Sequence, residues 1–147
     1  MIRQATKEDI TRLLKLGEAM HAESRFRDIS FSREKVTRLL DWLISGNGCL
    51  LVAERDGEII GGFAGGLTPY YFSEEKMATD LALFVSQDRR GGIAAVALVR
   101  SFIEWAHLNG AREVLLGTNY GEDSPANELY RRIGFNQVGN LFSSGVI

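Results

Sequence analysis

The residues Arg89-Arg90-Gly91-Gly92-Ile93-Ala94 combine two fixed positive charges with a glycine pair. An apolar run from Leu81 to Val85 precedes them, and apolar residues recur at helical spacing from Ile93 to about Leu108, so we expect a strand, a turn and a helix. The first N–H groups of a helix are unpaired and carry partial positive charge, and glycine lets the backbone approach a ligand. The segment therefore predicts a pocket for a phosphorylated ligand, with a purely packing role for the glycines as the alternative.

The turn matches neither of the common nucleotide-binding patterns. It has no GxGxxG sequence with an acidic residue downstream, and no GxxxxGK[ST] sequence. The nature of the phosphorylated ligand must therefore come from other parts of the chain.

The segments that would position this turn alternate between strands and helices. Thr6 with Asp9 resembles a capping box, and Asp56-Gly57 predicts a two-residue hairpin turn. Gly61, Gly62, Gly65 and Gly66 in the strand after that turn suggest a bulge or a close approach of another chain segment. We expect strands at 2–5, 49–55, 58–67, 80–85 and 113–117, one or two more after residue 135, a loop or strand edge at 70–79, and helices at about 6–20, 32–44, 93–108 and 126–133. This order predicts an α/β fold with a mixed sheet and helices on its faces.

Length and composition exclude several classes of function. A chain of 147 residues, 45% of them hydrophobic, is expected to form a single domain over residues 1–147. A net charge of −2 without a basic stripe argues against nucleic acid as a partner, and no apolar run is long enough to cross a membrane. One cysteine and two distant histidines offer neither a disulfide nor a metal site. With no apolar signal region at the N-terminus, we expect a cytoplasmic protein.

Two motifs together resemble the GNAT N-acetyltransferase family. That family carries Arg/Gln-x-x-Gly-x-Gly/Ala between a strand and a helix, and Arg89, Gly92 and Ala94 match it. The family often ends a later helix with Leu-Tyr-x-x-x-Gly-Phe, which the stretch from Leu129 to Phe135 matches in full. The resemblance covers almost the whole chain and implies a mostly antiparallel sheet of six to seven strands with about four flanking helices. Asp123, where many relatives have asparagine, departs from the family pattern.

The resemblance implies acetyl-CoA as the acyl donor. Its pyrophosphate would lie on the turn, and its pantetheine arm would pair with the backbone of the preceding strand like an additional strand. The cofactor-binding residues would be Leu83, Phe84, Val85, Arg89, Arg90, Gly91, Gly92, Ile93, Ala94 and Ala95.

The resemblance also implies a chemistry. A neutral amine attacks the thioester directly in a ternary complex, so a base must first remove a proton from the ammonium and an acid should protonate the departing sulfur. Tyr130 occupies the position of the acid, and Asp80, at the start of its strand, is the candidate base, sharing one strand face with Ala82 and Phe84 by alternation. A helix tyrosine that only packs and a solvated carboxylate are the respective alternatives.

The acceptor remains open between small-molecule and peptide amines. Residues 20–31 and 68–79, which lack a regular pattern, should select it, and Glu23 in the first of these segments could bind the amine or face solvent. A homodimer through a free sheet edge is possible. The alternative to an enzyme is a catalytically silent acyl-CoA-binding module that serves as a sensor or interaction partner.

Overall fold

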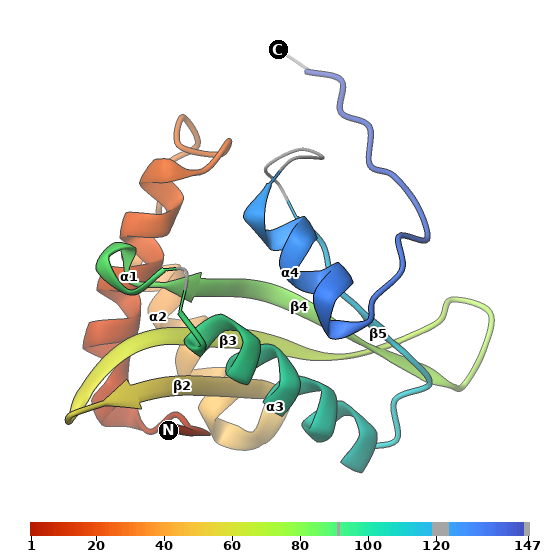
Figure 1. Ribbon diagram of the computed structural model, residues 1–147, viewed down its shortest axis with the longest axis horizontal. Helices are drawn as coiled ribbons and strands as arrows, with labels where there is room; N and C mark the ends of the chain where they lie inside the picture. Colours follow the sequence, from red (N-terminus) through yellow and green to blue (C-terminus); the bar gives the residue numbers. More distant parts are fainter. Residues whose placement is uncertain (91, 119–123, 146–147) are drawn as a thin grey trace.

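A mixed sheet forms the centre of the molecule (Figure 1). The computed structural model describes residues 1–90, 92–118 and 124–145, and within them the sheet has five strands in the order β1-β2-β3-β4-β5. The strands are β1 (Ile2–Gln4), β2 (Cys49–Arg55), β3 (Glu58–Pro69), β4 (Lys76–Val85) and β5 (Val114–Leu115). The first four pair antiparallel, and β5 pairs parallel with β4.

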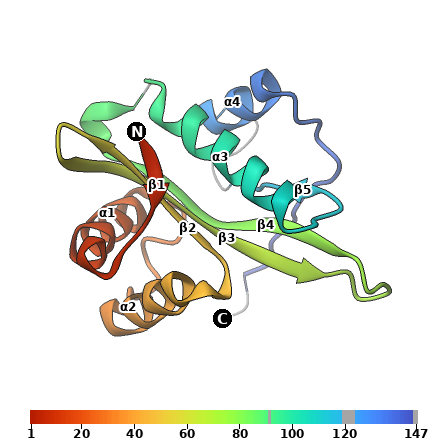
Figure 2. The same cartoon turned by 90° about the horizontal axis from the view of Figure 1, so that it is seen from below.

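Four α-helices cover the two faces of this sheet (Figure 2). They are α1 (Ile10–Glu23), α2 (Arg33–Trp42), α3 (Ala94–Leu108) and α4 (Pro125–Ile133), with short helical turns η1 (Lys7–Asp9), η2 (Leu43–Asn47) and η3 (Gln87–Arg89). One apolar core lies between α1, α2 and the sheet, around Leu13, Leu40 and Val52. The other lies between α3, α4 and the sheet, around Phe63, Phe102 and Tyr130.

Most of the predicted elements are confirmed. The Asp56-Gly57 turn joins β2 and β3 with positive φ values of 52° and 78°, as a tight hairpin turn requires. The mixed α/β fold is also confirmed. Several boundaries differ: α1 continues to Glu23, β3 to Pro69, and β4 begins at Lys76, inside the segment expected to be a loop or strand edge. Two elements are shorter than expected: α2 ends at Trp42, and β5 is confined to Val114–Leu115.

The expected strands after residue 135 are absent from the described part of that segment, residues 135–145, so the sheet has five strands there rather than six or seven. Figure 1 shows this segment leaving the end of α4 and running toward the C-terminus as an extended chain. Val138, Leu141 and Phe142 are 79%, 88% and 93% exposed, so their apolar side chains have not been drawn into the core. A stable strand needs a neighbouring strand, and no strand of the described residues pairs with this segment.

The glycine-rich strand β3 contains the close approach that its composition predicts. A Cβ atom on Gly65 would lie 2.7 Å from the ring of Phe102 and 2.7 Å from the carbonyl oxygen of Thr79. The register between β3 and β4 also shifts here, because Ala64 pairs with Ala82 and Gly65 with Asp80. Leu81 is therefore the additional residue of a β-bulge in β4.

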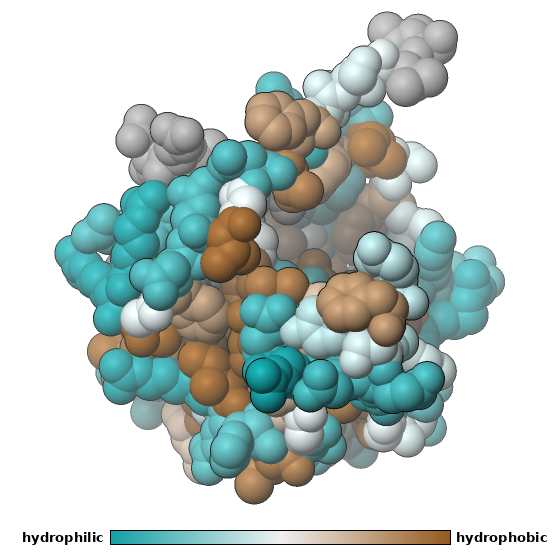
Figure 3. Space-filling model, turned by 90° about the vertical axis from the view of Figure 1, so that its right-hand side faces the viewer, coloured by the Kyte–Doolittle hydropathy of each residue, from teal (hydrophilic) through white to brown (hydrophobic). Residues whose placement is uncertain are grey.

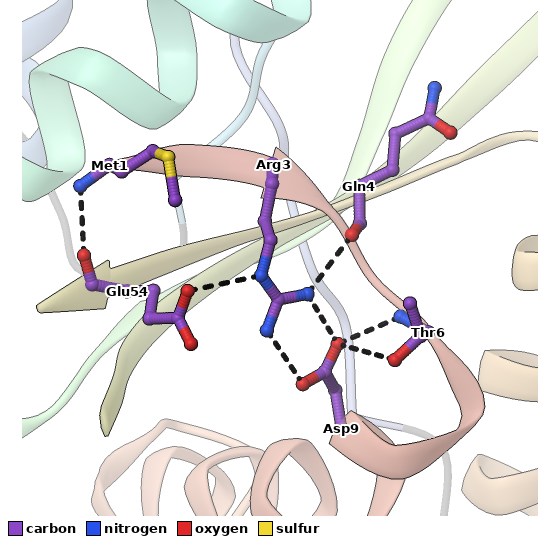
Figure 4. A network of polar contacts seen from close by, with 6 residues as sticks. All are labelled: Met1, Arg3, Gln4, Thr6, Asp9 and Glu54. Carbon is purple, nitrogen blue, oxygen red and sulfur yellow. Dashed lines mark hydrogen bonds and ion pairs between the residues drawn. The ribbon is translucent and has the colours of Figure 1, made fainter. Parts of the chain in front are cut away.

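The N-terminus is fixed by a charged network that the capping box only partly predicts (Figure 4). The predicted box is present: the Thr6 N–H donates to Asp9 Oδ2 at 2.7 Å, although it opens η1 rather than α1 directly. Arg3 adds a forked contact to the same carboxylate, at 2.8 and 3.0 Å, and a third bond of 3.2 Å to Glu54 on β2. The start of α1 is thus joined to two strands of the sheet.

Candidate functional site

Strands β4 and β5 separate shortly after they begin to pair. Their pairing is confined to Ala78 with Val114 and Thr79 with Leu115. From Asp80 to Val85 the outer edge of β4 has no neighbouring strand among the described residues. An open strand edge presents unpaired N–H and C=O groups, so this edge can receive an extended ligand.

The bulge at Leu81 decides which way Asp80 faces. Sequence alternation predicts that Asp80 shares a face with Ala82 and Phe84, and this is wrong. Ala82 and Phe84 belong to the core under α1 and α2. Asp80 pairs instead with Gly65, whose missing Cβ points at Phe102 of α3, so Asp80 lies on the α3–α4 face. The additional residue in the strand interrupts the alternation of faces.

Asp80 and Tyr130 lie on the same face of the sheet, and the Asp80 charge acts on the Tyr130 hydroxyl. The Gly117 N–H, just beyond β5, donates to Asp80 Oδ1 at 3.3 Å, so the carboxylate spans the gap between the separating strands. Burial raises the pKa of the Asp80 carboxyl above its usual range. Burial, with the Asp80 charge second, raises the pKa of the Tyr130 hydroxyl. At neutral pH Tyr130 is therefore protonated and can donate a proton or a hydrogen bond.

The Tyr130 hydroxyl is available although its ring is buried. The residue is 8% exposed and its ring packs against Phe135, with 5.8 Å between the ring centroids. Within residues 1–90, 92–118 and 124–145, the hydroxyl has no hydrogen-bond partner. In the same residues, every side-chain oxygen that is fully buried does have a partner. The hydroxyl oxygen must therefore reach solvent, as a group that acts on a ligand should.

At the C-terminal end of β4, the turn leads into the N-terminus of α3. Ile93 precedes the helix, and no side chain of the described residues caps it. Ile93 is 78% exposed, while Ala94 is buried against the α3 core. The first N–H groups of this 15-residue helix are thus left for solvent or for an anion. Gly91 lies outside the described residues, as does Asp123.

The backbone groups of β4 do not all face the open edge. The Ser86 N–H donates to Ile60 of β3 at 2.7 Å, and the Phe84 carbonyl also points toward β3, where it lies 2.9 Å from the Cβ position of Gly61. Because direction alternates along a strand, the groups of Leu83 and Val85 face the open edge. Leu83 and Val85 can therefore pair with an extended ligand, whereas Phe84 contributes its ring to the core under α1 and α2.

Arg90 connects the turn to α1, a contact for which the sequence carries no signal. Its Nε donates to the Val85 carbonyl at 3.1 Å, and its Nη1 lies 2.8 Å from Glu23 Oε2. Glu23, expected either to bind the acceptor or to face solvent, is thus paired with a cation of the turn. Arg89 has a different partner, the Asp88 carboxylate, at 3.8 Å.

The β3–β4 hairpin carries exposed aromatic residues on the side that Figure 3 shows. Tyr71 is fully exposed and Phe72 is 72% exposed, while the Tyr70 hydroxyl donates to Glu113 at 2.6 Å. These residues form the tip of the segment expected to select the acceptor. No cluster of metal-ligating side chains occurs among the described residues, and none of their helices has the length and apolar character to cross a membrane.

The sequence model of a known protein family matches most of the chain. The Acetyltransferase (GNAT) family model aligns with residues 16–135, which include the C-terminal half of α1, the turn and α4. The chain belongs to the GNAT family. Its match with N-acetyltransferase family 8 member 3 of Mus musculus is 33% identical over 102 residues, 69% of this chain and 44% of the mouse protein. The chain thus spans less than half of the curated relative.

Solved structures agree with the GNAT fold. Ribosomal-protein-alanine N-acetyltransferase from Brucella melitensis superposes with a TM-score of 0.81 at 23% identity, covering 95% of this chain and 86% of that one. An aminoglycoside acetyltransferase from an uncultured soil metagenomic sample, in complex with sisomicin, superposes at 0.73 with 20% identity, covering 99% and 96%. At these identities the likeness establishes the fold and leaves the acceptor open.

Proposed function

We propose that this GNAT protein transfers an acetyl group from acetyl-CoA to a primary amine by direct attack in a ternary complex. The observation that carries the proposal is the open edge of β4, with Asp80 and Tyr130 at one end and the uncapped N-terminus of α3 at the other. The acceptor is a small molecule or a peptide.

The residues along this edge fit the chemistry of the donor. Phosphate groups suit the free N–H groups of α3 and the guanidinium groups of Arg89 and Arg90. The amides of a pantetheine arm suit the outward backbone groups of Leu83 and Val85. The distance from Val85 back to Asp80 is five residues, or about 16 Å along a strand, so one extended molecule can contact both ends.

Asp80 and Tyr130 have complementary roles in the proposed reaction. Asp80 accepts a proton from the ammonium group of the acceptor, and its raised pKa makes it a better base than an ordinary aspartate. The amine nitrogen then bonds to the acetyl carbon as the carbon–sulfur bond breaks. Tyr130 donates its hydroxyl proton to the departing sulfur. The attached nitrogen loses its second proton to solvent, Tyr130 regains a proton from solvent, and Asp80 releases the one it took up.

The charge of Asp80 links these two roles. Negative charge on Asp80 opposes ionisation of Tyr130, because the two groups lie close enough for Asp80 to raise the pKa of the hydroxyl. Once Asp80 has taken up a proton, this opposition ends and Tyr130 becomes a stronger acid. We therefore expect the base to act before the acid within one turnover.

Calorimetry with acetyl-CoA and CoA tests the donor, and a primary-amine library with detection of released thiol tests the reaction. Saturable binding of both ligands and thiol release with at least one amine are expected. Tyr130→Phe should then lower kcat roughly 10²-fold or more while CoA binding is retained. The absence of CoA binding would contradict the proposed donor. CoA binding without thiol release from any amine would favour a silent acyl-CoA-binding module.

A further inference from the structure

Arg90 is held by two partners that belong to different parts of the fold. Its Nε–H points at the carbonyl of Val85, the last residue of β4, and its Nη1 meets the carboxylate of Glu23, the last residue of α1. Both side chains of the ion pair are partly exposed, at 45% for Arg90 and 39% for Glu23. A ligand can therefore reach the pair from solvent.

One partner of Arg90 lies where the proposed donor would bind, and the other lies on the acceptor side. The Val85 carbonyl is one of the outward groups of the open β4 edge, and Arg90 directly precedes the turn into α3. An extended ligand on this edge competes for the Val85 carbonyl, and its phosphates compete for the guanidinium. Glu23 in turn lies within 20–31, a segment expected to select the acceptor. The one side chain of Arg90 thus connects the donor side of the site with the acceptor side.

The charges favour an exchange of partners on donor binding. The two groups of a pyrophosphate together carry more charge than one carboxylate and accept forked bonds from arginine, and the N-terminus of α3 adds to their attraction. A partly exposed ion pair such as Glu23–Arg90 is worth little in water. Arg89 can replace Arg90 as the phosphate ligand only if it also exchanges a carboxylate for the phosphate, because its guanidinium lies 3.8 Å from the Asp88 carboxylate.

We propose that Glu23 is an internal competitor for the donor phosphates at Arg90, so that donor binding releases the Glu23 carboxylate toward the acceptor side. This inference rests on the proposed function, because it assumes a phosphorylated donor. In the donor-free protein Arg90 neutralises Glu23. After the exchange, Glu23 presents an unpaired negative charge at the start of the acceptor-selecting segment, which suits an acceptor that is itself a cation. Glu23 acts on the donor through Arg90 and is a positioning residue in that respect.

Calorimetry on the full chain tests this competition with two probes, CoA and pantetheine, which differ in their phosphate groups. Glu23→Gln should tighten binding of CoA roughly two- to five-fold, because the competitor for Arg90 is lost. The same change should leave the affinity for pantetheine unaltered, because pantetheine has no phosphate groups. Glu18→Gln is the matched control: it also removes a negative charge from α1, but its partner is Arg33, 3.8 Å away. This control should bind CoA like the wild type. Equal melting temperatures of the variants exclude misfolding as the cause.

A double-mutant cycle then shows whether Glu23 acts through Arg90. Arg90→Gln should weaken CoA binding, and adding Glu23→Gln to it should change nothing further. Equal CoA affinities of the wild type and Glu23→Gln, or equal gains from Glu23→Gln and Glu18→Gln, would refute the competition while leaving the proposed donor intact. A wild type that binds no CoA would refute the proposed donor and the competition together.

Discussion

Gly65 should be the position in β3 that least tolerates a methyl group. A Cβ on Gly65 would lie 2.7 Å from a ring carbon of Phe102 and 2.7 Å from the Thr79 carbonyl oxygen. Phe102 is fully buried and stacks on Phe63 at 4.3 Å, so its ring has little room to move. Gly65→Ala therefore forces a shift of backbone or core, and overpacking of this kind costs about 1–3 kcal/mol.

Gly66→Ala provides the control in the next residue of the same strand. Its Cβ would meet nothing closer than 3.9 Å, the Cα atom of Gly48, so a methyl group fits there. We expect Gly66→Ala to change the free energy of unfolding by less than about 0.5 kcal/mol, as ordinary surface changes do.

Thermal denaturation monitored by circular dichroism measures both variants. At this chain length about 1 kcal/mol corresponds to roughly 2–4 °C in Tm, so Gly65→Ala should melt several degrees below Gly66→Ala. Equal stabilities of the two variants would show that the core yields to the additional methyl group and that the close approach does not constrain the sheet. Because Gly65 pairs with Asp80, a shift there should also lower any acetyl-transfer rate.

Three ionisable groups give further predictions. Asp9→Asn should cost about 2 kcal/mol at neutral pH, because it weakens the charged bonds from Arg3. Arg3 lowers the pKa of the Asp9 carboxyl, so this stabilisation is present above the ordinary aspartate pKa and should disappear in denaturation curves as the pH falls through the lowered value. Asp80→Asn should raise Tm at neutral pH and not in acid, because burial raises the pKa of Asp80 and its ionised form is penalised as the pH rises through that value; a lower Tm at neutral pH would contradict this. Burial raises the pKa of the Cys49 thiol to about 12, so a thiol reagent should label it on unfolding only, and rapid labelling of the native protein would contradict its burial.

The helices and the hairpin could be predicted because their signals are local. Apolar spacing from Ile93 to Leu108 marks α3 to within one residue, and Asp56-Gly57 specifies a turn whose two positive φ values few other pairs tolerate. The expected phosphate binding at the turn also rests on local features, since it depends on a strand, glycines and a helix start in immediate succession, and it stays a prediction.

The features that were predicted wrongly or not at all depend on partners that are distant in sequence. The face of Asp80 depends on a bulge at Leu81, and an additional leucine in an apolar strand looks like any other strand residue. The strands expected after Phe135 required a neighbouring strand that the apolar composition of the segment does not provide. Arg90 and Glu23 meet across 67 positions of sequence, and nothing in either local pattern indicates the other.

The bulge in β4 also determines how the length of this strand can change during evolution. Loss of Leu81, which is 59% exposed and has no pairing partner in β3, would leave Asp80 on the α3–α4 face and Phe84 on the opposite face. Loss of a residue on either side of it would turn half of the strand over, bringing a carboxylate into one core or removing an aromatic ring from the other. Natural deletions in β4 of homologous chains should therefore concentrate at this one position.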